Sequence, residues 1–486
     1  AKTRRGQGAR AQSRGGNMNQ AGTRWSSLPG MMLGLAREMP DRPMLTAWRG
    51  GRWETLSWGD FAMRVASVAA WLRAQGVMPG DRVLLVSENR PEFLITDVAV
   101  MTIGAVTVPT YVTNTVADHA HVLGDSGARV AVVSTAALAR AVVEAAGRTA
   151  GLDLLVCMEA GAPAPPGGRS AEWAALEAAP SDVVMLMAEA EHIPEGRLAC
   201  LIYTSGTGGA PRGVMLPHRA LLANREGIRP LIARLEVAGE KYLSFLPMSH
   251  SYEHTVGGFL LPSFGMEVVY SRGADRLGAE MAEFKPAIIT AVPRLFEVLR
   301  ARITAQVEKD GGLKKRLFDQ ALALGLRKLD GPPLSLFEKA QDVVLDRLVR
   351  NKIRGRFGGN VRALVSGSAR LDPELSGFFL ALGLPLIQGY GQSEAGPVIS
   401  VNLPWDNARR SVGPPLPGVE VRIAEDGEIL VAGKLVMDGY WNNPEATEAA
   451  LRVPEGDGKT WLHTGDVGRL EEGRLVITDR KRDFIK

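Results

Sequence analysis

Apolar positions in the first third of the chain switch between a helical spacing and short continuous runs. Ser57 and Asp60 have the spacing of a capping box, which predicts the start of a helix that ends before Gly76. Residues 83–86 form the next apolar run, and its length is typical of a buried strand. The residues that fall on one face of the predicted helix are Phe61, Val65, Val68, Ala69 and Leu72.

The same alternation continues after this first strand. A helix is predicted to open at Pro91 and is followed by a strand over 106–108. A second helix reaches about Ser126, and residues 130–133 form another strand. Strands that alternate with helices predict parallel β-α-β units, whose sheet is covered on both faces.

Three later changes of pattern divide the rest of the chain. A segment rich in Ala, Pro and Gly at 161–168 precedes a second alternating block, which we expect to begin at Leu198. Residues 294–355 carry the spacing of long, charged, amphipathic helices, and short strands with Gly and Pro turns begin near Val412. We therefore predict an α/β fold with two helix-flanked, mainly parallel β-sheets and a small β-barrel-like subdomain.

Composition limits the class of protein. The 486 residues are too many for one ordinary core, and 45% hydrophobic and 23% charged residues are typical of a soluble globular protein. Cys157 and Cys200 have no ligand-like spacing, which argues against a disulfide framework or a zinc site and favours a reducing cytoplasm. The longest apolar candidate, 98–108, is shorter than the ~18 residues that span a bilayer, so we do not expect an integral membrane protein.

Positive charge is concentrated in two segments. Residues 1–24 contain six basic and no acidic residues and lack an apolar period, so we predict a disordered tail, with an expression remnant preferred to a nucleic-acid or membrane arm. Residues 294–356 contain fifteen basic and eight acidic residues. A solvated helical face is our preferred interpretation of that segment, and peripheral contact with anionic lipid is the alternative. We expect no nucleic-acid partner.

A segment of small and hydroxyl residues follows the strand that begins at Leu198. It reads Tyr-Thr-Ser-Gly-Thr-Gly-Gly-Ala-Pro-Arg over 203–212. Glycines let consecutive N–H groups converge on an anion, and Arg212 adds positive charge, so the segment predicts a phosphate-binding loop. A plain hairpin turn is the alternative. Walker A and dinucleotide-binding loops are excluded by the missing G-K-[ST] and by Pro211.

A second candidate segment is Gln-Gly-Tyr-Gly-Gln-Ser-Glu at 388–394. The aromatic ring of Tyr390, flanked by glycines, offers a flat face for a base, and Glu394 is an oxygen ligand suited to Mg²⁺. Taken alone, the segment is equally compatible with a tight loop beneath a core strand.

Together and in this order, the two segments resemble the Y-T-S-G-T-T-G-x-P-K-G-V and Y-G-x-T-E motifs of the adenylate-forming, or AMP-binding, superfamily. That superfamily includes acyl-CoA synthetases, peptide-synthetase adenylation domains and firefly luciferase. The resemblance runs from about Trp25 to the last residue, with matching segments at 365–369, 439–447, 462–466 and 479–486. The chain departs from the motifs at Gly208, Arg212 and Ser393, where the family has Thr, Lys and Thr.

The resemblance implies a role for individual residues. Tyr390 would stack on adenine, Asp466 would accept both ribose hydroxyls, and Arg480 would contact the ribose. The catalytic residues would be His250, Arg212, Glu394 and Lys486, with Glu394 as the Mg²⁺ ligand. The complete set of implied ATP- and AMP-binding residues is Thr204, Ser205, Gly206, Thr207, Gly208, Gly209, Gly367, Ser368, Ala369, Gln388, Gly389, Tyr390, Gly391, Ser393, Asp466 and Arg480.

The resemblance also implies a domain order. It consists of the tail at 1–24, an adenylating domain at 25–400 with the helical insertion 294–355, a β-rich subdomain at 401–481, and a hinge at 482–486. In the family a mobile C-terminal lid follows the hinge and donates a lysine for adenylation. Since the chain stops at this hinge, we expect it to bind nucleotide but to turn over poorly.

The substrate is implied by the long-chain fatty acid branch, which the chain resembles in three features. These are the H-x-x-E pattern from His250 to Glu253, the segment 389–402 and the helical insertion. The implied reaction activates a medium- or long-chain fatty carboxylate with ATP, releases pyrophosphate and transfers the acyl group to CoA. The alternatives are a fatty-acyl-AMP ligase that serves a carrier protein and a catalytically silent nucleotide- or acyl-binding protein. Chain length and oligomeric state stay open.

Overall fold

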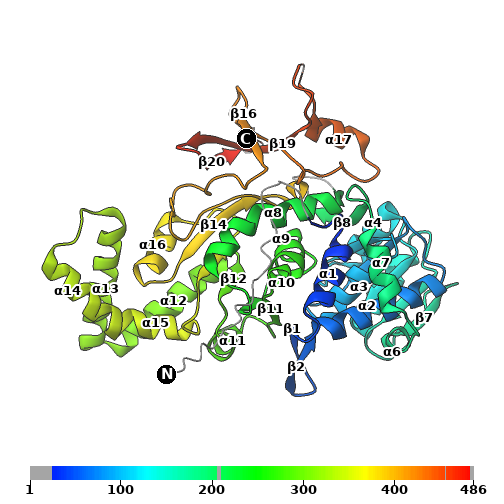
Figure 1. Cartoon of the computed structure of the whole chain (residues 1–486), viewed down its shortest axis with the longest axis horizontal. Coiled ribbons are helices and arrows are strands. Elements are labelled where there is room, and N and C mark those ends of the chain that lie inside the picture. The colour runs from blue at the N-terminus through cyan, green and yellow to red at the C-terminus, as the bar shows by residue number, and fades with distance from the viewer. Residues whose placement is uncertain (1–23, 205–209, 455, 482–486) are drawn as a thin grey trace, which may run out of the picture.

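The computed structural model describes residues 24–204, 210–454 and 456–481 (Figure 1). Three sheets of seven, eight and five strands account for the strands of these residues. The predictions for residues 1–23, for 205–209 of the candidate phosphate loop and for the hinge at 482–486 lie outside the described residues. Among the described residues, no helix has the length and apolar character needed to cross a membrane.

The seven-stranded sheet has the order β7-β6-β5-β3-β4-β8-β9 and is parallel except for the antiparallel pair β8 and β9. Its strands are β3 (Arg82–Val86), β4 (Val106–Thr110), β5 (Val130–Val133), β6 (Leu154–Cys157), β7 (Arg169–Glu172), β8 (Leu198–Thr204) and β9 (Arg212–Pro217). The helices that accompany this sheet are α1 (Leu28–Glu38), α2 (Trp58–Ala74), α3 (Pro91–Thr102), α4 (Val116–Ser126), α5 (Ala136–Ala146), α6 (Trp173–Glu177) and α7 (Val183–Glu191).

Alternate side chains of β3 show why both faces of this sheet are buried. Val83 and Leu85 belong to the core that contains α2 and α3, whereas Leu84 and Val86 belong to the core that contains α4 and α5. Successive residues of a strand point to opposite faces, so an all-apolar run is required where helices cover both. The prediction of a doubly covered, mainly parallel sheet is confirmed, as is the capping box of Ser57 and Asp60.

The eight-stranded sheet has the order β15-β14-β13-β12-β10-β11-β1-β2, with antiparallel pairs only at its two edges. Its strands are β1 (Pro43–Arg49), β2 (Arg52–Ser57), β10 (Lys241–Ser244), β11 (Glu267–Tyr270), β12 (Ile288–Ala291), β13 (Ala363–Ser366), β14 (Leu386–Gly391) and β15 (Val398–Val401). Its helical segments are α8 (His218–Leu235), α9 (Ser251–Thr255), η1 (Val256–Leu260), α10 (Leu261–Ser263), α11 (Leu277–Phe284) and α16 (Pro373–Ala381).

The division of strands between the two sheets differs from the sequence prediction. The linker at 161–168 does not separate the sheets, because β8 and β9 follow it in sequence yet extend the first sheet beside β4. Conversely, β1 and β2 precede the first sheet in sequence and form an edge of the second sheet through parallel pairing of β1 with β11. Strand pairing across such sequence distances is decided by tertiary contacts, which local periodicity does not record.

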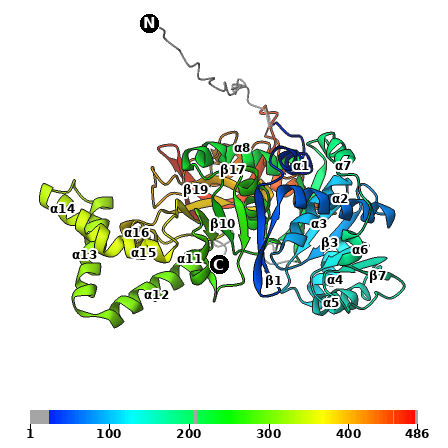
Figure 2. The same cartoon turned by 60° about the horizontal axis from the view of Figure 1, so that its bottom comes forward.

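A helical arm extends from one end of the molecule in both views (Figures 1 and 2). It consists of α12 (Pro293–Asp310), α13 (Gly312–Asp330), α14 (Leu336–Leu345), η2 (Asp346–Arg350) and α15 (Asn351–Arg356). The helical character predicted for 294–355 is therefore confirmed. The inner part of the arm packs on α16, where Phe296 contacts Phe379 and Phe318 contacts Phe378.

The third sheet is antiparallel and lies along one side of the molecule (Figure 1). It contains β16 (Glu420–Ile423), β17 (Glu428–Ala432), β18 (Leu451–Arg452), β19 (Trp461–Glu471) and β20 (Arg474–Arg480), with α17 (Pro444–Ala450) beside it. This sheet is the small β-rich unit that the turn-rich pattern after Val412 predicts. The exact domain bounds stay predictions.

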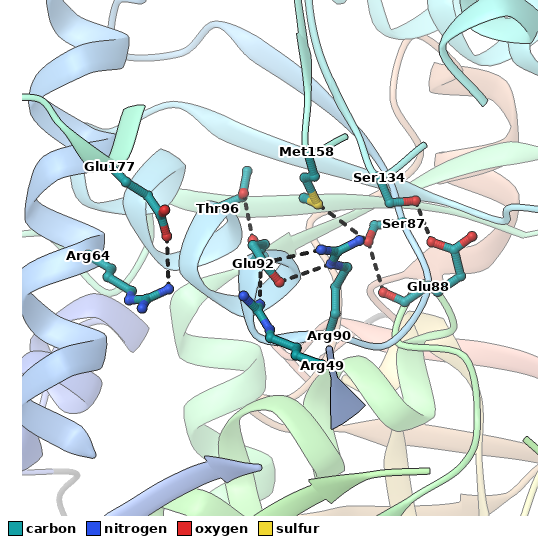
Figure 3. Close-up of polar contacts among 10 residues, drawn as sticks. All are labelled: Arg49, Arg64, Ser87, Glu88, Arg90, Glu92, Thr96, Ser134, Met158 and Glu177. Carbon is teal, nitrogen blue, oxygen red and sulfur yellow. Dashed lines mark hydrogen bonds and ion pairs between the residues drawn. The ribbon is translucent and has the colours of Figure 1, made fainter. Parts of the chain in front are cut away.

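Charged side chains connect the first two sheets. Glu92, which opens α3 and is 2% exposed, is paired with Arg49 at the end of β1 and with Arg90 (Figure 3). The two arginines hold the pKa of the Glu92 carboxyl below its usual value against the opposing effect of its burial. The amide of Asn89 adds hydrogen bonds to Ser244 and to the backbone of Leu246. These contacts hold the two sheets in one arrangement.

Candidate functional site

A cavity of about 630 Å³ lies where elements of all three sheets meet. Thr204 at the end of β8, Gly367 after β13 and Gly389 in β14 contribute to its wall from the first two sheets, and Asp466 in β19 contributes from the third. Thr204 and Gly367 lie at or just beyond the carboxyl ends of β8 and β13, which is the end of parallel strands where open α/β sheets bind ligands, whereas Asp466 lies within an antiparallel strand. The arrangement brings residues more than 200 positions apart into one wall.

At one end of the cavity, Asp466 is held by two hydrogen bonds. The hydroxyl of Tyr390 donates to Oδ2 at 2.7 Å, and Nε of Arg480 donates to Oδ1 at 3.1 Å. Burial, followed by the neighbouring Asp466 carboxylate, raises the pKa of Tyr390 well above its usual value, so the phenol keeps its proton. Because a carboxylate has about four lone-pair sites, Asp466 retains capacity for further donors.

The backbone around this end is close-packed at two glycines. A Cβ on Gly391 would overlap the carbonyl oxygen of Pro397, and a Cβ on Gly367 would lie 2.9 Å from the ring of Tyr252. Ser368, the next residue, adopts a left-handed conformation with φ of 65°. Only glycine allows the chain to pass this close to Pro397 and Tyr252, so packing requires a glycine at both positions.

Glu394 lies beside the ring of Tyr440, which is in turn in contact with the guanidinium of Arg212. Its Oε1 accepts a hydrogen bond from the hydroxyl of Tyr440 at 2.8 Å, and the guanidinium of Arg212 lies 5.5 Å from the centre of the Tyr440 ring. Arg212 is paired with Thr204 across β8 and β9. Burial and then the Glu394 charge raise the pKa of Tyr440, which therefore donates to the carboxylate.

His250 is a neutral donor at the edge of the apolar region. Its Nδ1 accepts a hydrogen bond from the backbone N–H of Tyr252 at 3.1 Å, which places the ring proton on Nε2. Burial lowers the pKa of His250 below its usual value, so the neutral ring persists at pH 7. Beside it, the hydroxyls of Ser251 and Ser393 lie 2.7 Å apart and are both buried.

The other end of the cavity is apolar. Its lining comes from α8, from η1 and α10, and from residues of β12 to β15. Spacing of three and four residues along α8 places its contributors on one face. The apolar wall consists of Ile228, Leu231, Ile232, Leu235, Val256, Leu260, Leu261, Ile288, Ala363, Val365, Ile387, Val398 and Val401.

A buried carboxyl lies behind this region. Glu253 accepts hydrogen bonds from the hydroxyls of Tyr242, Ser244 and Thr290 at 2.7, 2.6 and 3.2 Å. Burial raises the pKa of Glu253 to about 7, although the three donors oppose that effect. A Cβ on Gly257 would overlap the Glu253 carboxyl, so the glycine makes room for it. Glu253 does not line the cavity. Its buried hydrogen bonds give the Glu of the H-x-x-E pattern a role in packing.

Most of the described candidate residues line the same cavity. They are Thr204, Arg212, His250, Gly367, Ser368, Gly389, Tyr390, Gly391, Ser393, Glu394, Asp466 and Arg480. Gln388 does not line it, because its side chain is bonded to the backbone of Leu371 and Ser411. Ala369 is exposed and also lies outside the lining. The predictions for Ser205, Gly206, Thr207, Gly208, Gly209 and Lys486 fall outside the described residues.

Sequence reasoning missed several polar residues of the lining, among them Tyr440, Ser251 and Glu428. Tyr440 lies in the matching segment 439–447 without a predicted role, yet its hydroxyl contacts Glu394. Ser251 directly follows His250 and was passed over although it contacts Ser393. Glu428 lines the cavity near Asp466 and bonds Lys481 and the backbone of Gly465 at 2.7 and 2.9 Å. The sequence contains a signal for Glu428, because this acidic residue begins the otherwise apolar strand β17.

Glu394 is the candidate ligand for a divalent cation. Among the described residues, no group of three or more His, Cys, Asp or Glu side chains is arranged to hold a metal. Glu394 offers carboxylate oxygen at the cavity wall. Mg²⁺ is commonly held by one or two carboxylates together with substrate phosphates, and Glu394 could hold the ion in that mode.

Comparison with known proteins gives a family match and close relatives. The model of the AMP-binding enzyme family matches residues 35–441. The long-chain-fatty-acid–CoA ligase FadD15 of Mycobacterium tuberculosis is 34% identical over 463 residues, which cover 94% of this chain and 74% of the relative. The peroxisomal long chain acyl-CoA synthetase 6 of Arabidopsis thaliana is 31% identical over 472 residues, covering 90% and 63%.

Solved structures with the same fold are more distant in sequence. A long-chain-fatty-acid–CoA ligase (FadD1) from Archaeoglobus fulgidus superposes with a TM-score of 0.71 at 20% identity, covering 93% of this chain and 84% of that one. The o-succinylbenzoate coenzyme A synthetase of Bacillus subtilis, solved with AMP, has a TM-score of 0.66 at 20% identity, covering 94% and 79%. At this identity the likeness establishes the fold, and the predicted fold class is confirmed.

Proposed function

The chain belongs to the AMP-binding enzyme family, and on that premise we propose that it activates fatty carboxylates with ATP. In the first step a carboxylate oxygen attacks the α-phosphorus, so that an acyl-adenylate forms and pyrophosphate leaves. In the second step the CoA thiolate attacks the acyl carbon, a thioester forms and AMP leaves. Division into two steps makes AMP a good leaving group.

The observation that carries the proposal is the two-part cavity. Its polar end contains Asp466, Glu394 and His250, and its other end is formed by the apolar wall. A nucleotide needs fixed donors and acceptors, whereas an alkyl chain needs only apolar surface, so an acyl-adenylate matches both ends at once. The apolar wall and the names of the relatives support a medium- or long-chain acid.

We assign the nucleotide contacts to residues whose positions are already constrained. Tyr390 would present its ring to adenine, because its hydroxyl is tied to Asp466. Asp466 would accept the ribose hydroxyls, and Arg480 would lie beside them. The backbone at Gly367 and Gly391, both of which line the cavity, would border the base.

Charge at the reacting phosphate is the main obstacle to the first step, because a carboxylate has to approach an anion. The Nε2–H group of the neutral His250 would donate a hydrogen bond to an oxygen of the reacting centre. Arg212, the first residue of β9, would supply positive charge. Glu394 would hold Mg²⁺ with the phosphates, and the ion when bound supplies further positive charge.

CoA is the proposed acyl acceptor because the relatives are named as CoA ligases and synthetases. A cytoplasmic location also stays a proposal.

Fatty-acid-dependent exchange of labelled pyrophosphate into ATP tests the first step without any acceptor. We expect exchange with fatty acids and none with amino acids, and loss of exchange in Glu394→Gln with AMP affinity retained. AMP binding without exchange, both in this chain and in a form extended past Lys486, would support the silent binding protein. Mass spectrometry after addition of CoA or of a carrier protein tests the acceptor, and acyl transfer to the carrier alone would contradict our choice. A form extended past Lys486 tests whether turnover needs further residues.

A further inference from the structure

The helical arm contributes no residue to the cavity. Its helix α14 lies at the outer end of the molecule in both views (Figures 1 and 2). One side of α14 packs on α13, where Leu345 joins a small core with Ala321 and Leu324. The opposite side of α14 and of η2 therefore faces away from the body.

That opposite side carries large apolar side chains. The exposed fractions are 85% for Leu336, 79% for Phe337, 59% for Val343, 54% for Val344 and 47% for Leu348. Leu336 and Val343 are seven residues apart, as are Phe337 and Val344, and Leu348 follows Val344 by four. These spacings place the five residues along one side of the helix, which we call the outer stripe. An apolar stripe on the solvent side of an amphipathic helix marks an interaction surface.

The acidic residues of this segment are turned toward the body. Glu338 is paired with Arg327 of α13. Asp342 is paired with Lys328 at 3.1 Å and with the buried Arg350 at 2.6 Å. Their negative charges are thus neutralised on the side of α14 that faces α13.

The remaining carboxylate of η2 is neutralised as well, while the cations around the outer stripe are not. Asp346 is paired with Arg354 at 2.7 Å. Lys339, Arg347 and Lys352 are exposed and form no ion pair with any described residue. The outer stripe therefore combines apolar side chains with uncompensated positive charge.

We propose that the outer stripe docks on the surface of an anionic lipid bilayer. Leu336, Phe337 and the valines would enter the boundary between headgroups and acyl chains, and Lys339 and Arg347 would contact lipid phosphates. Helices with an apolar face bordered by Lys and Arg bind membranes in this way. A second copy of the chain fits less well, because two cationic stripes would face each other. The proposal does not depend on the reaction at the cavity.

Vesicle flotation of the whole protein tests the proposal. One set of vesicles contains phosphatidylcholine alone and the other also contains phosphatidylglycerol. We expect binding to the second set, weakened by salt. The double variant Leu336→Ser/Phe337→Ser should reduce the partition coefficient at least about tenfold, because both side chains leave the apolar phase. Lys339→Glu/Arg347→Glu should also remove binding while leaving the stripe apolar.

The matched control is Val184→Ser/Met185→Ser on α7, at the other end of the molecule, where the two side chains are 72% and 53% exposed (Figure 1). This variant should bind vesicles like the unchanged protein. Circular dichroism melts establish that each variant is folded. The proposal would be overturned if the unchanged protein did not bind vesicles or bound both vesicle types equally. It would also be overturned if Leu336→Ser/Phe337→Ser bound vesicles as strongly as the unchanged protein. A dimer that dissociates in Leu336→Ser/Phe337→Ser without any vesicle binding would overturn it as well.

Discussion

Side chains at the polar end of the cavity hold one another in place before any ligand is present. Asp466 is fixed by Tyr390 and Arg480, and Glu394 by Tyr440. Such contacts restrict rotamers in advance, so less conformational entropy is lost when a ligand binds. Tyr390, Asp466, Arg480 and Glu394 were identified from their motifs, whereas Tyr440 was not.

Asp466→Ala should weaken AMP binding by about 1–3 kcal/mol, the scale of losing hydrogen bonds to a charged group. The physical reason is that ribose hydroxyls lose their acceptor, while Tyr390 and Arg480 lose their common partner. Titration calorimetry with AMP measures the effect. Glu471→Ala, on the same strand but exposed and paired only with Arg469, is the control and should leave the affinity unchanged. An unaltered affinity of Asp466→Ala would remove this residue from the site.

Tyr440→Phe should raise the Mg²⁺ concentration needed for half-maximal pyrophosphate exchange by about tenfold, the lower range for loss of a hydrogen bond to a metal ligand. The variant removes the donor to Glu394 but keeps the ring beside Arg212. AMP affinity should not change. Tyr440→Ala removes both contacts and should be more severe. An unaltered Mg²⁺ requirement in Tyr440→Phe would show that Glu394 needs no such support.

At the scale of elements, helix ends carry polar groups that decide how the chain responds to pH. His218 opens α8 and is fully buried, and its Nδ1 accepts from the backbone N–H of Leu28, the first residue of α1. Burial, assisted by the charge of Arg197, lowers the pKa of His218 to about 3. The junction of α1 and α8 therefore requires a neutral imidazole.

The free energy of unfolding should fall as the pH decreases from 6.5 toward 3. In that window the unfolded state protonates His218 but the folded state does not, so the unfolded state binds more protons. A pH of 5 lies about one and a half units below the pKa of a histidine in the unfolded chain. At that pH the protonation of His218 in the unfolded state lowers the free energy of unfolding by about 2 kcal/mol. Urea unfolding at several pH values measures the slope.

His218→Gln should reduce that slope whatever its effect on stability at pH 7. His192→Gln is the matched control, because His192 is exposed and should leave the slope unchanged. Equal slopes in His218→Gln and the unchanged protein would contradict the assignment of acid sensitivity to this junction.

At the scale of the whole molecule, the cavity exists only because three sheets meet. Its apolar wall takes α8, η1 and four strands of the second sheet, and its polar end takes β19 and β20 of the third. No single sheet encloses a ligand. Binding of one acyl-adenylate would therefore contact elements that are far apart in the chain and stabilise their arrangement.

Affinity for non-hydrolysable acyl-adenylate analogues should increase by about fourfold for each added methylene until the apolar end is full. This factor corresponds to about 0.8 kcal/mol per buried CH₂. Ile232→Trp, on the wall formed by α8, should shorten the preferred chain while AMP affinity is retained. Calorimetry with a series of chain lengths measures both. A series without length dependence would exclude this end of the cavity as the acyl site.

The sequence by itself determined the local elements and the chemistry of the motifs. Capping at Ser57 and Asp60, the strand at 83–86 and the helix at Pro91 depend on neighbours within a few residues, so periodicity and caps identify them. Tyr390, Glu394 and Asp466 were identified because each lies in a motif, and the structure brings these three to one cavity.

Only the tertiary structure decided which strands pair and which residues meet. The assignment of β1 and β2 to the second sheet and of β8 and β9 to the first depends on contacts across long stretches of chain. The contact of Tyr440 with Glu394 joins residues 46 positions apart, and the outward orientation of Leu336 depends on where α13 lies. Local patterns contain no record of such distances, so the cavity wall and the outer stripe emerge from packing alone.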